Sequence, residues 1–230
     1  MFLLRRATNI QRLPLNRSFF SGIFETGLSP LAKKSIVEPL VSEGWKVTTD
    51  MDIRGSSRAT LENNTEGGEG GLRWRGHTSL DLDQNSKAVK TGFVSITSPP
   101  LGGMLTPYLD LDDYETLMLT LRKRDNRNYI VNLHPDSYIN GEIYQGYIMD
   151  DREEEDVLAL GDNVEEITVK LPFSNFMLTK EGRVSTHQRT MDGIVRLQNV
   201  GLLLADGREG DFDLEVIKIE AIGKYYQEEE

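Results

Sequence analysis

Alternation of apolar and polar positions dominates the chain from Trp45 onward. A period of two residues is typical of a strand with one buried face, and it recurs over residues 117–121, 129–133, 167–171 and 212–216. Residues 200–204 are apolar at both alternations, which favours a strand covered on both sides or central in a sandwich. Further strands are expected at residues 57–62, 71–80, 91–97 and 143–148. No helical period of any length follows residue 45, so the pattern predicts an all-β sandwich or jelly roll.

Turn residues separate two of these strands. Asp125-Asn126 stands between the alternating segments 117–121 and 129–133, which predicts a β-hairpin. The run Arg122-Lys123-Arg124 is then interpreted as a solvated turn rather than as a binding patch, because short charge runs are usually surface.

The first residues of the chain differ in composition from the rest. Residues 1–24 contain Arg5, Arg6, Arg12 and Arg17, no acid, and interspersed Leu, Ile and Phe. This composition predicts a mitochondrial presequence over residues 1–22, with a mature start near Phe20; a disordered basic tail is the alternative.

Residues 23–42 are expected to form an arm with a short helix. Ser29 is its candidate N-cap, Pro30 takes the first helical position, and Pro39 ends it. The apolar anchors are Leu31, Ile36 and Leu40. Either the arm docks loosely on the body or a partner captures it. A single β-sandwich domain over residues 43–225 and an acidic tail over 226–230 complete the expected organisation.

Composition narrows the function classes. The 230-residue chain has a formal net charge of −11, which argues against a broad nucleic-acid surface. It has no cysteine, so disulfides, thiolate metal sites and a cysteine nucleophile are excluded. No stretch approaches the roughly 18 consecutive apolar residues of a membrane span, so we expect a soluble protein or one peripheral to a membrane.

Two polar stretches are expected to be exposed loops. Residues 63–71 are glycine-rich and polar, so a mobile loop is predicted. Residues 150–156 are mostly acidic, and their mutual repulsion favours a solvated loop. The functional alternative for the acidic run is a docking site for a basic partner or a cation.

Metal and phosphate motifs are weak. Residues 50–55 begin like an EF-hand loop, but Arg54 and Leu61 occupy ligand positions, so the match fails. Asp110, Asp112 and Asp113 could join a calcium site, although turn and capping roles are favoured. His77, His134 and His187 form no ligand pair, and the glycines of residues 67–71 and 207–210 lack a phosphate-loop context.

Carbohydrate chemistry is the other class considered. The chain has 37 acidic residues, so a glycoside hydrolase with paired carboxylates is an alternative that rests on abundance alone. Trp45, Trp74, Tyr108 and Tyr129 could line a sugar-binding face, but core packing is favoured for them. We therefore predict no catalytic, cofactor-binding or metal-binding residue and no cofactor, and assign no binding surface.

Several segments, in order over roughly residues 43–222, resemble one known family. They are Trp45 with Asp50, Gly55 and Ser57; Leu72–Gly76; Gly92–Ile96; Asp110–Tyr114; Asp125–Tyr129; Leu171–Phe173 with Phe176; and Val200–Leu202 before Gly210–Phe212. Together they are similar to the complex I intermediate-associated protein family. Arg54 and Asn126 depart from the family pattern, which tends to have glycine at both positions.

The resemblance implies a galactose-binding-like jelly roll and a non-enzymatic chaperone of the mitochondrial matrix. Such a protein transiently binds membrane-arm assembly intermediates of NADH:ubiquinone oxidoreductase and other assembly factors, and it associates peripherally with the inner membrane. It implies that the matched glycines, aromatics and aspartates are scaffold. A carbohydrate or small-ligand module is the second function hypothesis, and the hydrolase is the third.

Overall fold

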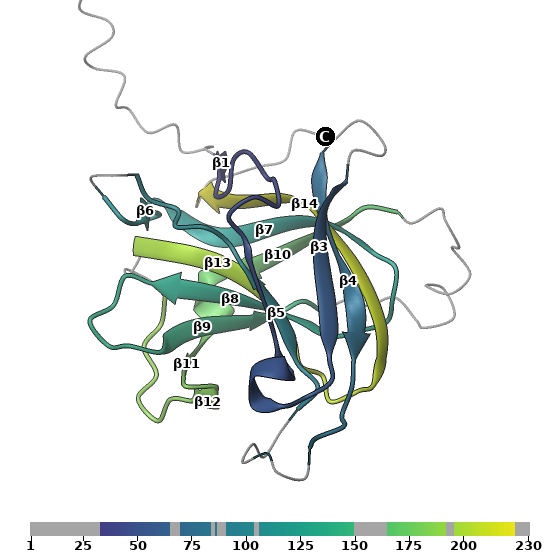
Figure 1. Ribbon diagram of the computed structural model, residues 1–230. Coiled ribbons are helices and arrows are strands. Elements are labelled where there is room, and N and C mark those ends of the chain that lie inside the picture. The colour runs from purple at the N-terminus through teal and green to yellow at the C-terminus, as the bar shows by residue number, and fades with distance from the viewer. Residues whose placement is uncertain are drawn as a thin grey trace, which may run out of the picture.

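The computed structural model describes residues 33–64, 70–83, 86, 91–103, 106–149, 165–191 and 196–223. Within these ranges the chain forms two antiparallel sheets, of six and eight strands, stacked as a β-sandwich (Figure 1). The expected all-β class is therefore confirmed. No helix among the described residues is long and apolar enough to cross a membrane.

The six-stranded sheet, sheet A, has the order β10-β7-β14-β4-β3, and β1 pairs with β14 beside this path. Its strands are β1 (Lys33–Ser35), β3 (Arg58–Asn64), β4 (Gly71–Thr78), β7 (Tyr114–Lys123), β10 (Ile167–Pro172) and β14 (Gly210–Gly223).

The eight-stranded sheet, sheet B, has the order β12-β11-β9-β8-β13-β5-β2, and β6 pairs with β13. Its strands are β2 (Lys46–Thr49), β5 (Val94–Thr97), β6 (Leu109–Asp110), β8 (Tyr129–Pro135), β9 (Glu142–Tyr147), β11 (Met177–Lys180), β12 (Arg183–Val184) and β13 (Arg196–Leu204). The doubly apolar segment 200–204 lies in β13, between β8 and β5, so its predicted central position is confirmed.

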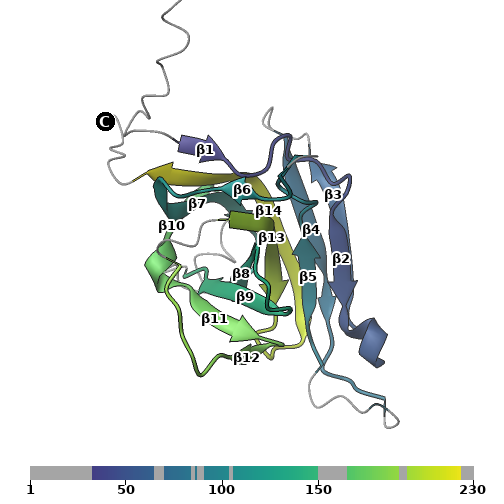
Figure 2. The same ribbon diagram turned by 90° about the vertical axis from the view of Figure 1, so that its left-hand side faces the viewer.

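Strand β14 is the central strand of sheet A and pairs with β1, β4 and β7. Its first half pairs with β4 and its end pairs with β1, as Figure 2 shows. The register against β7 shifts between Val216 and Lys218, and Ile217 is the extra residue. A bulge reverses which alternate residues face inward. Phe212, Leu214 and Val216 are therefore buried before it, and Ile219 and Ala221 after it.

The core between the sheets is apolar and includes the large aromatics of the matched segments. Trp74 is fully buried and its ring lies 5.0 Å from that of Phe212 and 5.8 Å from that of Tyr129. Trp45 is half-buried and packs against the same core, and the ring of Tyr108 lies 4.7 Å from the guanidinium of Arg196. The core interpretation is thus correct for Trp74 and Tyr129, which cannot form a sugar-stacking face.

The predicted hairpin between residues 117–121 and 129–133 is wrong. Strand β7 pairs with β10 and β14 in sheet A, whereas β8 pairs with β9 and β13 in sheet B. Residues 124–128 therefore cross from one sheet to the other. Alternation specifies which face of a strand is buried but not which strand lies beside it.

The predicted N-terminal helix is also wrong over its described part. Lys33–Ser35 forms strand β1 on the edge of β14, and the amide of Ile36 donates to the carbonyl of Ile219 at 2.8 Å. Ile36 and Val37 are buried in the core. Of the expected helix anchors, Ile36 is thus a core residue that directly follows strand β1, and Leu40 is partly buried against the core. Ser29 and Leu31 lie outside the described residues, as do the presequence, the acidic run 150–156 and the tail 226–230.

A buried aspartate closes the end of the sandwich near β2. The carboxylate of Asp50 is fully buried and accepts hydrogen bonds from the amide of Ser57 (2.9 Å), its hydroxyl (2.8 Å) and the amide of Gly92 (2.7 Å). A Cβ at Gly55 would lie 2.2 Å from this carboxylate. Arg54, the departure from the family pattern, has a φ of 67°, a conformation that favours glycine. Asn126, the other departure, does not have positive φ.

Candidate functional site

The outer face of sheet A carries charged side chains in columns of alternating sign. Outward positions are basic on β7 (Arg122 and, just beyond its end, Arg124), acidic on β14 (Asp211, Asp213 and Glu215) and basic on β4 (Arg73, Arg75 and His77). The register places opposite signs side by side, which stabilises a sheet through cross-strand pairs. We call these eight residues the charged face.

Glu215 is the centre of the charged face and is fully buried. It accepts hydrogen bonds from Arg122 (3.0 Å), Arg124 (3.2 Å) and the amide group of Asn64 (2.8 Å). Lys123, whose side chain has the opposite orientation, is also buried. The expected solvated turn at residues 122–124 is therefore wrong, because a buried carboxylate needs these cations as partners.

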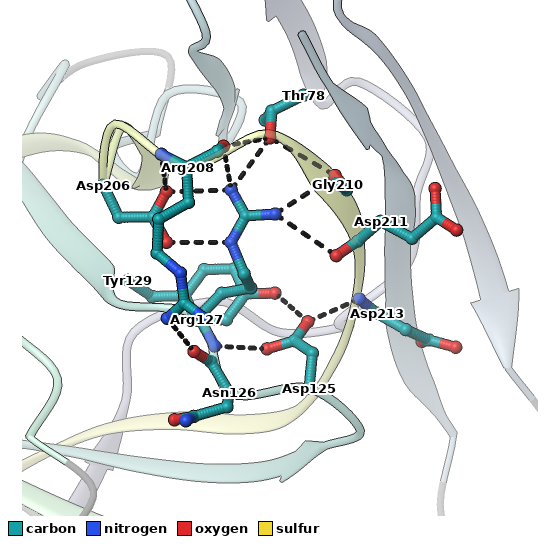
Figure 3. A network of polar contacts seen from close by, with 10 residues as sticks. All are labelled: Thr78, Asp125, Asn126, Arg127, Tyr129, Asp206, Arg208, Gly210, Asp211 and Asp213. Atoms are coloured by element: carbon teal, nitrogen blue, oxygen red, sulfur yellow. Dashed lines mark hydrogen bonds and ion pairs between the residues drawn. The ribbon is translucent and has the colours of Figure 1, made fainter. Parts of the chain in front are cut away.

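Next to the charged face, Arg127 holds two loops together (Figure 3). Its guanidinium makes a bidentate pair with Asp206, with both bonds at 2.8 Å, and donates to the carbonyls of Arg208 (2.7 Å), Gly210 (3.1 Å) and Asp211 (3.2 Å). The side chain of Arg127 is 5% exposed. We call Arg127 and Asp206 the loop clamp, because it locks the β7–β8 crossing to the β13–β14 loop.

Ionisation of the loop clamp follows from these contacts. Hydrogen bonding to Asp206 raises the pKa of Arg127, so the guanidinium keeps its charge. Burial on its own would raise the pKa of Asp206, but hydrogen bonds from Arg127 and from the backbone lower it overall. The clamp is therefore an ion pair at neutral pH.

Asp125 and Tyr129 brace the crossing from the core side. The Tyr129 hydroxyl donates to Asp125 at 2.6 Å, and the same carboxylate accepts from the amides of Asp213 (2.6 Å) and Arg127 (3.0 Å). Burial raises the pKa of Asp125, an effect that these three donors partly offset. Burial and the neighbouring Asp125 also raise the pKa of Tyr129 well above 10, so the hydroxyl remains a donor.

A hollow of about 700 Å³ lies over this end of the charged face. Its floor is formed by β4 and β14, one wall by the clamped loops at residues 124–127 and 208–210, and the other by Arg58–Thr60 of β3. Gly76 allows β3 to lie this close to β4, because a Cβ at this position would lie 2.0 Å from the carbonyl oxygen of Arg58. The volume is typical of ligand-binding sites, so this is the candidate functional site.

The cations of the hollow differ in how far they are neutralised. Arg124 and Arg127 are paired with buried or half-buried acids, and the exposed Arg75 pairs with Glu62 at 3.1 Å. Among the described residues, the guanidinium of Arg208 donates only to the carbonyl of Asn126 (2.7 Å), and the side chain of Arg58 has no hydrogen bond or ion pair. The hollow can therefore offer two guanidiniums to an incoming carboxylate or other anion.

Three sequence segments that resemble the family meet at this hollow: Leu72–Gly76, Asp125–Tyr129 and Gly210–Phe212. The sequence assigned them scaffold roles and identified no surface. Arg58 and Arg208 were missed because single arginines in an acidic chain carry no local signal. Arg127 could have been singled out as the one cation inside the segment Asp125–Tyr129.

The other sequence candidates lie apart from the hollow or at its rim. His77 faces the exposed Asp211 at 2.7 Å, burial lowers the pKa of His134, and His187 is exposed. Asp110 accepts from the amide of Asp112 at 3.1 Å, which agrees with the favoured turn role. Within the described residues, no group of three or more histidine or acidic side chains is placed to hold a metal ion.

Comparison with known proteins identifies the family. The family model described as Complex I intermediate-associated protein 30 (CIA30) matches residues 35–216. The chain belongs to this family. Over 185 residues it is 31% identical to "Complex I intermediate-associated protein 30, mitochondrial" of Drosophila melanogaster, which covers 77% of the chain. The chain spans 58% of the length of that CIA30 relative.

Solved structures share the fold of this CIA30 chain at low sequence identity. The family 11 carbohydrate-binding module of the Clostridium thermocellum cellulase Lic26A-Cel5E has a TM-score of 0.56 and 12% identity, covering 87% of this chain and 99% of the module. A family 11 module from the same organism, bound to a mixed-linked tetrasaccharide, has a TM-score of 0.54 and 12% identity, covering 85% and 98%. At this identity the likeness shows the sandwich fold alone.

Proposed function

We propose that the chain is a mitochondrial assembly factor for respiratory complex I. The family match over residues 35–216 carries the proposal, supported by the 31% identical Drosophila relative, whose name includes both complex I and mitochondrial. The factor binds incomplete membrane-arm subassemblies transiently, together with other assembly factors, and performs no catalysis itself.

We further propose that the hollow on sheet A is the surface that binds these intermediates. It is rigid, because Arg127 ties both of its loops to each other through five hydrogen bonds to Asp206 and to backbone carbonyls. A preformed surface loses little conformational entropy on binding. It also contains three of the segments through which the chain resembles its family.

The location of the protein follows the same proposal. Residues 1–22 direct import as a presequence, and a mature protein with the sandwich over residues 43–225 works in the matrix, peripheral to the inner membrane. The carbohydrate alternative loses two of its four candidate aromatics, because Trp74 and Tyr129 are core residues.

Deletion of the gene in its own organism tests the assembly role. We expect fully assembled complex I, measured by native gel electrophoresis, to fall and membrane-arm subassemblies to accumulate. Re-expression of the full chain should restore assembly, with the other respiratory complexes as internal controls. Unchanged complex I in the deletion strain would overturn the proposal.

A further inference from the structure

Strand β3 is an open edge of sheet A. It is the last strand in the sheet order, and among the described residues no strand other than β4 is hydrogen-bonded to it, although β2 of sheet B lies in contact with it. Its far end is partly covered, since Asn63 accepts a hydrogen bond from the amide of Ser42 at 2.6 Å. Alternate residues of 58–62 therefore direct N–H and C=O groups without a strand partner away from β4, and such groups can pair with an added strand.

The same part of β3 faces the hollow and interrupts the charge pattern of the sheet. The outward side chains are acidic on β14 and basic on β4, so continued alternation of charge would place acidic side chains on β3. Glu62 of β3 follows this pattern and pairs with Arg75 of β4. Arg58 instead lies opposite His77 and has no acidic partner among the described residues. Because opposite charges pair across neighbouring strands, an acidic partner for Arg58 would come from a strand added beside β3.

We propose that β3 binds an extended segment of the assembly partner as an added strand, and that a carboxylate of this segment pairs with Arg58. This inference rests on the proposed function, because it names the ligand class of the same hollow. Backbone hydrogen bonds to β3 supply affinity that is independent of sequence, and the carboxylate sets the register. Arg208, on the opposite wall, is the second cation available to acidic residues of the segment.

Reversing the charge of Arg58 distinguishes a loss of strand binding from a general loss of the fold. Arg58 is exposed and unpaired, so Arg58→Glu leaves the core intact. Arg183→Glu is the matched control, because Arg183 is an exposed strand arginine in β12 of the other sheet and has no ion pair to a described residue. Both variants should unfold at the wild-type urea concentration.

The experiment uses the full chain, tagged and purified from mitochondria, followed by binding to short overlapping peptides that tile each captured complex I subunit. We expect a binding peptide to contain an acidic residue and to bind Arg58→Glu about tenfold or more weakly, while Arg183→Glu binds normally. Replacing that acid by lysine should weaken binding to the wild type by a similar factor and restore binding to Arg58→Glu. Amides of β3 should gain protection from hydrogen exchange when the peptide is bound.

Two failures are distinguishable. If the wild-type chain captures no complex I subunit, the proposed function fails, and this inference falls with it. If subunits are captured but no tiling peptide binds, or peptides bind wild type and Arg58→Glu equally, or β3 gains no protection, the assembly role stands and strand addition at β3 is wrong.

Discussion

Two residues near the β2 end of the sandwich, Asp50 and Arg54, have features that by themselves would destabilise the fold. The carboxylate of Asp50 is removed from water, and three hydrogen bonds compensate for this. They join the turn after β2 to the residues that precede β3 and β5. Arg54, four residues on, holds a backbone conformation that glycine would adopt without penalty. Asp50 matches the family pattern and Arg54 departs from it. The fold explains the first by its hydrogen bonds and shows the backbone conformation that the second must adopt.

Replacing Asp50 by alanine should strongly destabilise the protein. The change leaves the amides of Ser57 and Gly92 buried without this acceptor, and leaves the Ser57 hydroxyl only the carbonyl of Ser79 at 3.4 Å. We expect a cost of about 3–5 kcal/mol in the free energy of unfolding. Urea denaturation measures it. Asp52→Ala, an exposed change in the same 3₁₀ turn, is the control and should shift stability by no more than about 0.5 kcal/mol. Equal effects for the two variants would contradict the stabilising role of the Asp50 hydrogen bonds.

Replacing Arg54 by glycine should stabilise the protein. Glycine removes the free-energy cost of the left-handed conformation, but it also increases the entropy of the unfolded chain, which offsets part of this effect. We therefore expect the free energy of unfolding to rise by about 0.5–1 kcal/mol. The matched control is Arg54→Ala, which deletes the same side chain and retains the cost. If Arg54→Ala stabilises as much as Arg54→Gly in urea denaturation, backbone conformation is not the reason.

At the scale of elements, the sequence was informative about strands and uninformative about their neighbours. Residues 167–171 and 212–216 alternate because one face of each strand packs on the core, and both were predicted where β10 and β14 lie. The neighbours of β7 and β8 could not be predicted, because Asp125-Asn126 is compatible with either a hairpin or a crossing between sheets.

The hollow could not be predicted for a related reason. Arg127 and Asp206 are 79 residues apart in the chain, and no local pattern connects them. Arg58 becomes notable only when the register places it at an open sheet edge beside a basic strand. Segments that resembled the family identified part of this region, but they could not distinguish packing residues from surface residues.

The loop clamp should make stability depend on pH in a defined direction. The pKa of Asp206 in the folded protein lies below its ordinary value of 3.8, so the carboxylate stabilises the fold above pH 3.8 and this contribution is lost as the pH falls through the lowered value. Asp206→Asn should therefore cost about 3 kcal/mol at neutral pH, because Arg127 loses its buried counter-ion. The gap between wild type and variant should narrow in acid.

Urea denaturation of both proteins across this pH range measures the gap. Asp211→Asn is the control, since its side chain is 91% exposed and contributes little to stability at any pH. A gap that stays constant, or widens on acidification, would show that Asp206 does not act as the counter-ion of Arg127.

At the scale of the whole molecule, three features of the described residues bear on the proposed binding role. The sandwich is a rigid support, and the arginines of the charged face pair with acids of the face or of neighbouring segments. At one end of sheet A, Arg58 and Arg208 have no ion pair to a described residue and lie near the edge strand β3. Such a surface suits reversible contact with a partner segment, which agrees with the proposed assembly role.

The most direct test of that role is the migration of the tagged full chain in mitochondrial membranes solubilised and separated by native electrophoresis, with each slice analysed by mass spectrometry. The account predicts that the chain comigrates with incomplete membrane-arm subassemblies and is absent from mature complex I. Migration only as a free protein, with no complex I subunit in the same slices, would contradict it.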